Sequence, residues 1–310
     1  MVDSQDQFVN RVGIEISGTA LTAVVIGEND AVVSSRSIAV TDAESMVPQL
    51  IELIEDLKKE YGGFSRVGVA VPGLVDRTSG RVAFSANIPE YAKVDLVKSV
   101  RAATGLEVVI ENDANAAAVG EFCRGAGRGS RNMFYATLGE GVGGAFIFAG
   151  EIWRGAAGFA GEFGYVPINS EGMRLEDVAS AANIVRRTRS RFHQDSTSSL
   201  SKLSEEEINM NEIIAAAERD DDFAQMMLER TGMYVGTAVA SVINLLNIEK
   251  VVVGGEIMQA KHLVLHALVE RARELSFAPS FDSTSIVEGE LGTDAAAIGA
   301  AFISGSHEST

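Results

Sequence analysis

The sequence predicts an α/β protein of two lobes with a cleft between them. Its 310 residues exceed the length of roughly 250 to 300 at which a single hydrophobic core stops growing. Short β-branched runs alternate with segments of helical periodicity in both halves, which favours sheets covered by helices. Each half also opens with two strands joined by a glycine-containing turn, so we expect an internal structural duplication.

The first half begins with three short runs that predict antiparallel strands. Two of them, 12–17 and 21–26, flank the turn Ser17-Gly18-Thr19, and the third covers 32–40. Helices and strands then alternate. The predicted helices are 43–61, 94–104 and 113–123, and the predicted strands are 66–71 and 107–111.

The second half starts again with strands, at 132–138 and 144–149, around a glycine-rich turn. Helical stretches are predicted at 175–192, 205–246, 258–276 and 294–304, and strands at 250–253 and 284–288. We place the boundary between the halves near Gly125 to Gly129. The predicted lobes are therefore 1–127 plus 294–310, and 128–293.

Composition and charge exclude several classes of function. The chain carries 43 acidic and 26 basic residues, a net charge of −17, which repels nucleic acids and anionic membranes. Its single cysteine, Cys123, and four histidines show no zinc-ligand spacing. The first ten residues lack the pattern of a signal peptide, and no run of 18 apolar residues occurs. We therefore expect a cytoplasmic protein with neither nucleic acid nor membrane as partner.

Asp113 follows a predicted buried strand and begins a predicted helix, in the stretch Glu111-Asn112-Asp113. Asp113 is expected in the first helical turn, where the helix dipole favours an ionised carboxylate that can accept a hydrogen bond from a substrate hydroxyl. The alternative is that Asp113 only caps the helix, a common role of aspartate.

Glycines recur between Leu138 and Gly144, where they let backbone N–H groups approach a phosphate without side-chain obstruction. A tight hairpin turn explains the same glycines equally well. Further along, Glu162 in Gly161-Glu162-Phe163-Gly164-Tyr165 places a carboxylate among small residues, which suits a polyol, and Glu176 adds another.

Five stretches carry a resemblance to a known family. They are ENDANAAAVGE at 111–121, LGEGVGG at 138–144, GAAGFAGEFGYVPI at 155–168, VVVGGE at 251–256 and GTDAAAIGAA at 292–301. In this order and at these intervals they resemble the ROK family of repressors, open reading frames and sugar kinases. The resemblance runs from about Val12 to Phe302 and implies two actin-like (ribonuclease H-like) lobes of the hexokinase-type ATPase fold.

The resemblance also implies roles for individual residues. Asp113 would be the general base that accepts the proton of a sugar hydroxyl as it attacks the γ-phosphoryl group of ATP, with Mg²⁺ present. The residues expected to contact the sugar are Gly73, Asn87, Asn112, Glu162, Tyr165 and Glu176. The residues expected to contact the nucleotide are Glu15, Gly18, Thr19, Gly139, Glu140, Gly141, Gly143, Gly254 and Gly255. A homodimer is expected on the same ground.

Two phosphate motifs depart from the family pattern. The first normally reads Asp-x-Gly-Gly-Thr, but Glu15 and Ser17 replace its aspartate and first glycine. Glu15 would hold Mg²⁺ through water, and Ser17 narrows the turn. In the second motif Glu140 replaces the usual threonine. A like charge ~4 Å from a phosphate costs about 4 kcal/mol at an effective dielectric constant of ~20, so ATP affinity should suffer unless Glu140 turns away or binds metal.

The zinc motif of the family is missing. Tyr165 stands where the family has a histidine ligand, and the segment 169–174 replaces the cysteine-rich loop. We therefore expect no structural zinc, no side chain that binds a metal ion directly, and a sugar loop held by packing.

Two functions remain open. The first is an ATP-dependent hexose kinase of glucokinase type, with Asp113 as base. The second is a catalytically weak or inactive sugar-binding regulator of the same family. The altered phosphate motifs, at Glu15, Ser17 and Glu140, favour this function. About ten residues precede the first predicted strand, too few for the helix-turn-helix domain that the repressors carry. The intact set of sugar residues favours the kinase.

Overall fold

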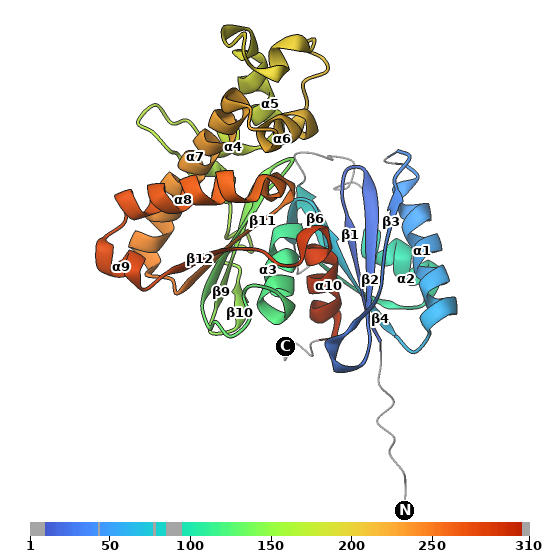
Figure 1. Ribbon diagram of the computed structural model, residues 1–310. Helices are drawn as coiled ribbons and strands as arrows, with labels where there is room; N and C mark the ends of the chain where they lie inside the picture. The colour runs from blue at the N-terminus through green and yellow to red at the C-terminus, as the bar shows by residue number, and fades with distance from the viewer. Residues whose placement is uncertain (1–9, 43, 77–78, 85–94, 306–310) are drawn as a thin grey trace, which may run out of the picture. The chain divides into compact units, whose positions relative to one another are not determined.

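The computed structural model describes residues 10–42, 44–76, 79–84 and 95–305, which form two compact units (Figure 1). The first unit contains Met1–Arg124, Arg154–Ala160 and Thr293–Thr310, and the second contains Gly125–Trp153 and Gly161–Gly292. Each unit has its own hydrophobic core, and the predicted α/β class is confirmed. The predicted lobe boundaries and the cleft between the lobes stay predictions.

A five-stranded sheet forms the centre of the first unit, with strand order β3-β2-β1-β4-β7. Its strands are β1 (Arg11–Ile16), β2 (Ala20–Ile26), β3 (Val32–Ala39), β4 (Arg66–Val71) and β7 (Glu107–Asn112). The pairs β1–β2 and β2–β3 are antiparallel, as expected from the three opening runs. The pairs β1–β4 and β4–β7 are parallel, so the carboxyl ends of β1, β4 and β7 share one edge.

The sheet of the second unit repeats this arrangement. Its order is β10-β9-β8-β11-β12, with β8–β9 and β9–β10 antiparallel and β8–β11 and β11–β12 parallel. The strands are β8 (Met133–Leu138), β9 (Val142–Phe148), β10 (Glu151–Trp153), β11 (Lys250–Gly254) and β12 (Ser285–Glu288). The same order and the same directions confirm the expected duplication.

The last helix of the chain packs against the first sheet, where α10 (Ala295–Gly305) contacts β1, β4 and α3 (Asp113–Arg124). The approach is so close that a Cβ atom on Gly68 of β4 would lie 2.0 Å from the carbonyl oxygen of Ala300. On the α3 side, a Cβ atom on Gly299 would lie 1.7 Å from the carbonyl oxygen of Ala116. Glycines at these positions therefore let α10 hold α3 against the sheet. The other helices of this unit are α1 (Met46–Tyr61) and α2 (Leu96–Thr104).

Two predicted helical runs of the second unit are wrong as single elements. The run 175–192 divides at Ser180, which has extended backbone, into α4 (Glu176–Ala179) and α5 (Ala181–Arg189). The run 205–246 becomes α6 (Met210–Glu218) and α7 (Asp222–Leu246). Asp220 has a φ of 60°, and the Asp221 side chain caps α7 at the N–H of Ala224. Local capping thus overrides a continuous apolar period.

Among the strands and α-helices of the described residues, four short ones were missed by the sequence analysis. They are β5 (Leu74–Asp76), β6 (Arg81–Phe84), β10 and α9 (Ala278–Asp282). Each has three to five residues, too few for a period to be read. The remaining helix, α8 (Lys261–Leu275), packs along α7. Within the described residues, none of these helices is both long and apolar enough to cross a membrane.

Candidate functional site

The strand register of the first unit brings predicted site residues to one sheet edge. Glu15 of β1 pairs with Ala70 of β4, which pairs in turn with Glu111 of β7. Gly73 follows the end of β4, and Asn112 is the last residue of β7. Since parallel strands end at the same edge, residues from three distant stretches of sequence meet there.

Asp113 is the first residue of α3, and hydrogen bonds hold its carboxylate. Its Oδ1 accepts from the N–H of Ala114 at 2.8 Å and from Nδ2 of Asn112 at 2.9 Å. The cap of the helix is Asn112, whose Oδ1 accepts from the N–H of Asn115 at 3.0 Å. Asp113 is therefore not needed as the capping residue, which weakens the alternative that capping is its sole role.

The side chain of Asn112 forms its hydrogen bonds with other groups of the protein. Besides the bond to Asp113, Nδ2 donates to the carbonyl oxygen of Gly73 at 3.0 Å. Both donor hydrogens of the amide thus have partners, and its oxygen serves as the helix cap. These contacts orient Asp113, and they leave Asn112 less able to donate to a sugar hydroxyl than the resemblance implies.

Glu15 lies part-buried beside two other acids. Burial, followed by the charges of Asp113 and Asp294, raises the pKa of Glu15 from 4.5 to about 7. Asp294 directly precedes α10, so the helix that packs on the sheet also brings the third carboxylate close. A cation at this edge would relieve the repulsion, although the described residues contain no group of three ligands that could hold a metal by themselves.

The raised pKa of Glu15 makes stability depend on pH. The folded state keeps a proton on Glu15 up to about pH 7, whereas the unfolded chain loses it near 4.5, so stability falls as pH rises between these values. The expected loss is about 3 kcal/mol by pH 8, and Glu15→Gln should abolish it. Urea unfolding of the metal-free protein at pH 5 and pH 8 measures this. A Glu15→Gln variant with the same loss of stability as the wild type would contradict the assignment.

In the first predicted phosphate turn, some of the backbone N–H groups already donate to the side chain of Ser17. The Oγ atom of Ser17 accepts from the N–H of Ala20 at 3.0 Å and from that of Thr19 at 3.4 Å. Gly18 and Thr19 are exposed, as a phosphate-binding turn requires. The Ser17 hydroxyl nevertheless competes for the same N–H groups, a consequence of replacing glycine that the sequence alone did not indicate.

The second predicted phosphate turn joins β8 to β9. Gly139 donates its N–H to the carbonyl oxygen of Gly141 at 3.0 Å, whereas the N–H groups of Glu140 and Gly141 have no partner among the described residues. Gly143 pairs with Thr137 within the sheet, so it is a strand residue rather than part of the turn. The turn therefore offers two adjacent donors to an anion.

Two acids lie close to this second turn. Burial and the charge of Glu140 raise the pKa of Glu256, which follows Gly254 and Gly255 at the end of β11. Gly254 pairs with Thr137 of β8, and a Cβ atom on Gly255 would lie 2.3 Å from the carbonyl oxygen of Leu138. The turn and the glycine pair are therefore neighbours, and Glu256 is an acid near the turn that the sequence analysis missed.

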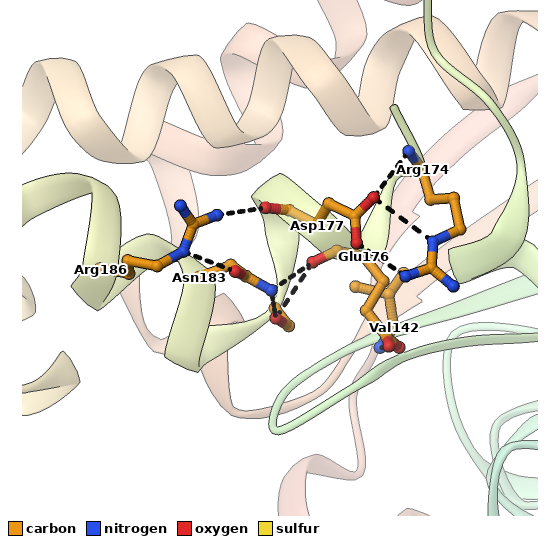
Figure 2. Close-up of polar contacts among 7 residues, drawn as sticks. Val142, Arg174, Glu176, Asp177, Asn183 and Arg186 are labelled. Atoms are coloured by element: carbon orange, nitrogen blue, oxygen red, sulfur yellow. Dashed lines mark hydrogen bonds and ion pairs between the residues drawn. The ribbon is translucent and has the colours of Figure 1, made fainter. Parts of the chain in front are cut away.

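The predicted sugar carboxylates Glu162 and Glu176 influence one another. Burial and then the charge of Glu176 raise the pKa of Glu162. Oε2 of Glu176 accepts from the N–H of Val142 at 3.2 Å, and its backbone carbonyl accepts from Asn183 at 2.9 Å (Figure 2). Glu176 thus ties the second turn to the start of α4, whereas Glu162 keeps part of its surface exposed to solvent.

Tyr165 belongs to a loop held by an arginine. The guanidinium of Arg174 lies 4.9 Å from the centroid of the Tyr165 ring. The same guanidinium donates to Asp177 at 3.0 Å (Figure 2). The loop closes as a short hairpin, with the N–H of Leu175 donating to the carbonyl oxygen of Val166 at 3.0 Å. These contacts hold the shortened loop by stacking and an ion pair. The absence of zinc stays a prediction.

The structure thus assembles the predicted residues into two groups, one in each unit. The first unit brings Glu15, Gly73, Asn112 and Asp113 together, with Gly18 and Thr19 in the turn after β1. The second unit gathers the rest, namely Gly139, Glu140, Gly141, Gly143, Glu162, Tyr165, Glu176, Gly254 and Gly255. Asn87 lies outside the described residues. That the two groups act on one substrate belongs to the proposal below.

Comparison with known proteins gives this arrangement a context. The model of the ROK family matches residues 11–306. The chain belongs to the ROK family. A glucokinase of Thermotoga maritima is 32% identical over 307 residues, which cover 94% of this ROK protein and 96% of the relative. A xylose repressor of Caldicellulosiruptor bescii is 30% identical, covering 83% of this chain and 68% of the repressor.

A solved structure extends the likeness of this ROK protein to three dimensions. The ROK family glucokinase of Streptomyces griseus in complex with glucose and AMPPNP superposes with a TM-score of 0.84 at 28% identity. The match covers 95% of this chain and 99% of that enzyme. The predicted actin-like fold of the family is therefore confirmed, and its relatives include both sugar kinases and repressors.

Proposed function

We propose that this protein transfers the γ-phosphoryl group of ATP to a hydroxyl group of a hexose. Asp113 accepts the proton of the attacking hydroxyl. Glu162 and Glu176 bind sugar hydroxyls beside Tyr165. The proposal requires the two groups of residues to face one substrate, as the complex of the S. griseus enzyme with glucose and AMPPNP makes reasonable for a protein of this fold.

The observation that carries the proposal is the environment of Asp113. Two hydrogen bonds to Oδ1 fix the carboxylate at the first residue of α3, where the helix dipole stabilises negative charge. Phosphoryl transfer needs little covalent chemistry from the protein, so a fixed carboxylate within reach of the hydroxyl is a sufficient base.

The residues at the two turns fit a nucleotide in part. The N–H groups of Glu140 and Gly141 suit phosphate oxygens, while Ser17 reduces what the first turn offers. Mg²⁺ usually binds through phosphate oxygens, water and one or two carboxylates, so Glu15 would suffice on the protein side. Bound there, the ion would supply charge neutralisation.

A coupled assay of ADP release across a panel of hexoses and N-acylated hexosamines tests the proposal. We expect turnover with at least one hexose at a rate above that of ATP hydrolysis without sugar. Failure of every sugar to stimulate ADP release at high protein concentration would contradict it.

A second candidate function is supported by the acids at the second turn. Glu140 and Glu256 place two carboxylates near the proposed phosphate position, and Ser17 occupies N–H groups of the first turn. A protein that binds sugar but holds ATP poorly would act as a sugar-responsive regulator. Calorimetry that detects sugar binding without ATP binding would favour this function over the kinase.

Removing the charge of Glu140 should strengthen nucleotide binding. We expect Glu140→Thr to lower the Kd for ATP·Mg²⁺ about tenfold, which corresponds to about 1.4 kcal/mol. The control is Glu151→Thr, an equal change of charge at an exposed position of β10. Calorimetry measures both variants. An unchanged Kd in Glu140→Thr would mean that Glu140 turns away from the phosphates.

A further inference from the structure

A buried ion pair lies directly before Asp113 in the sequence. Glu111 is 3% exposed, and its Oε2 accepts from Nε and Nη2 of Arg154 at 3.2 and 2.8 Å. Its Oε1 accepts from the N–H of Asn112 at 3.1 Å and from Nδ2 of Asn115 at 3.0 Å. Glu111 therefore connects Arg154 to both residues that build the cap of α3.

Arg154 is also the first residue of an unusual segment. The segment 154–160 groups with the first unit, although Trp153 before it and Gly161 after it belong to the second. The N–H of Ala160 donates to the carbonyl oxygen of Arg154 at 3.0 Å, so the segment closes on itself at Arg154. We call residues 154–160 the strap.

Glycines within the strap and directly after it allow its backbone to take this course. Gly155, Gly158 and Gly161 have φ angles of 71°, 85° and 101°, which disfavour any residue with a side chain. Directly after Gly161 comes Glu162, one of the proposed sugar ligands. The strap therefore joins the ion pair with Glu111 at its beginning to a sugar ligand at its end.

From these contacts we propose that Arg154 is a positioning residue for phosphoryl transfer, an inference that rests on the proposed kinase function. The Arg154–Glu111 pair holds the start of the strap at the strand–helix junction that carries Asp113. It thereby holds the Asn112–Asn115 cap that orients Asp113, and the strap that it anchors leads along the chain to Glu162. Two nitrogens of one guanidinium donate to the same oxygen of Glu111, and these two contacts define an orientation that a single ammonium group cannot define.

The test compares two arginines of the same unit. Arg154→Lys keeps the positive charge but loses the two-point contact. Its matched control is Arg66→Lys, because Nε and Nη2 of Arg66 donate to a single oxygen of Glu107 at 3.0 and 2.9 Å. That carboxylate is exposed and lies at the opposite end of β7.

We expect Arg154→Lys to reduce kcat/KM for the sugar on the order of 10- to 100-fold, through both kcat and KM, because small misplacements of reacting groups cost this much. The KM for ATP and the midpoint of urea unfolding should stay near wild-type values, and Arg66→Lys should change none of these quantities. A double variant, Glu111→Gln with Arg154→Met, leaves no buried charge unpaired and should show the same kinetic loss.

Wild-type kinetics in Arg154→Lys and in the double variant would overturn the inference. So would a lower unfolding midpoint accompanied by an unchanged sugar KM, since that pattern indicates a purely structural role. If the wild-type protein has no kinase activity, calorimetric titration with glucose becomes the readout. Weaker sugar binding by Arg154→Lys then supports the inference, and unchanged binding overturns it. If the wild-type protein neither phosphorylates nor binds any sugar, both the kinase function and the positioning role of Arg154 are contradicted.

Discussion

Asp113→Asn should reduce the kcat of sugar-dependent ADP release by about 10³-fold, within the range that a positioned general base contributes. The amide keeps the size of the carboxylate and can still accept from the N–H of Ala114, so binding should persist. We therefore expect the KM values for sugar and ATP to change by less than about threefold, because the lost interaction acts only in the transition state. Steady-state kinetics with a sugar that the wild type phosphorylates measures all three constants.

The control for this variant is Asp222→Asn. Asp222 is the first residue of α7, as Asp113 is of α3, and an aspartate precedes it as cap. Its substitution removes the same charge from the same helical position outside the proposed site. A variant Asp113→Asn that keeps more than about a tenth of the wild-type kcat would rule out general base catalysis at this position.

Gly299→Val should be the most damaging change to the fold. The added Cβ atom would lie 1.7 Å from the carbonyl oxygen of Ala116 and 2.8 Å from the backbone nitrogen of Gly120. Backbone atoms cannot move away as a flexible side chain does, so α10 and α3 must separate. We expect a loss of about 3 kcal/mol or more in the free energy of unfolding, at or above the upper end for overpacked cores.

Urea unfolding measures this loss. Ala182→Val, at an exposed position of α5, provides a control for added bulk within a helix, and it should change stability by less than about 0.5 kcal/mol. Because Asp113 begins the helix that α10 contacts, Gly299→Val should also lower activity at temperatures where the protein remains folded. A stability equal to that of the wild type would mean that α10 does not approach α3 so closely.

The repeated pattern of strands was predictable from sequence, because it depends on spacing along the chain. Runs of β-branched residues around a glycine turn occur twice, and the two sheets have the same order and directions. The place of Asp113 at the start of a helix follows from the predicted strand 107–111 and the alanine-rich run behind it, although the observed strand ends one residue later, at Asn112. Helix ends were harder to predict, because one capping side chain can start a new helix inside a run whose apolar residues keep a continuous helical spacing. Asp221 does this at the start of α7.

The environment of each candidate residue required the folded chain. The amide of Asn112 reaches a carbonyl group 39 residues away, and Arg154 reaches a carboxylate 43 residues away. No local pattern encodes these pairs, because they depend on strand order, on register and on the closed strap. The same applies to Glu15, whose pKa rises through burial and through acids that other elements bring near. Spacing along the chain is a local property that residue types carry, whereas burial and contact depend on how distant segments pack.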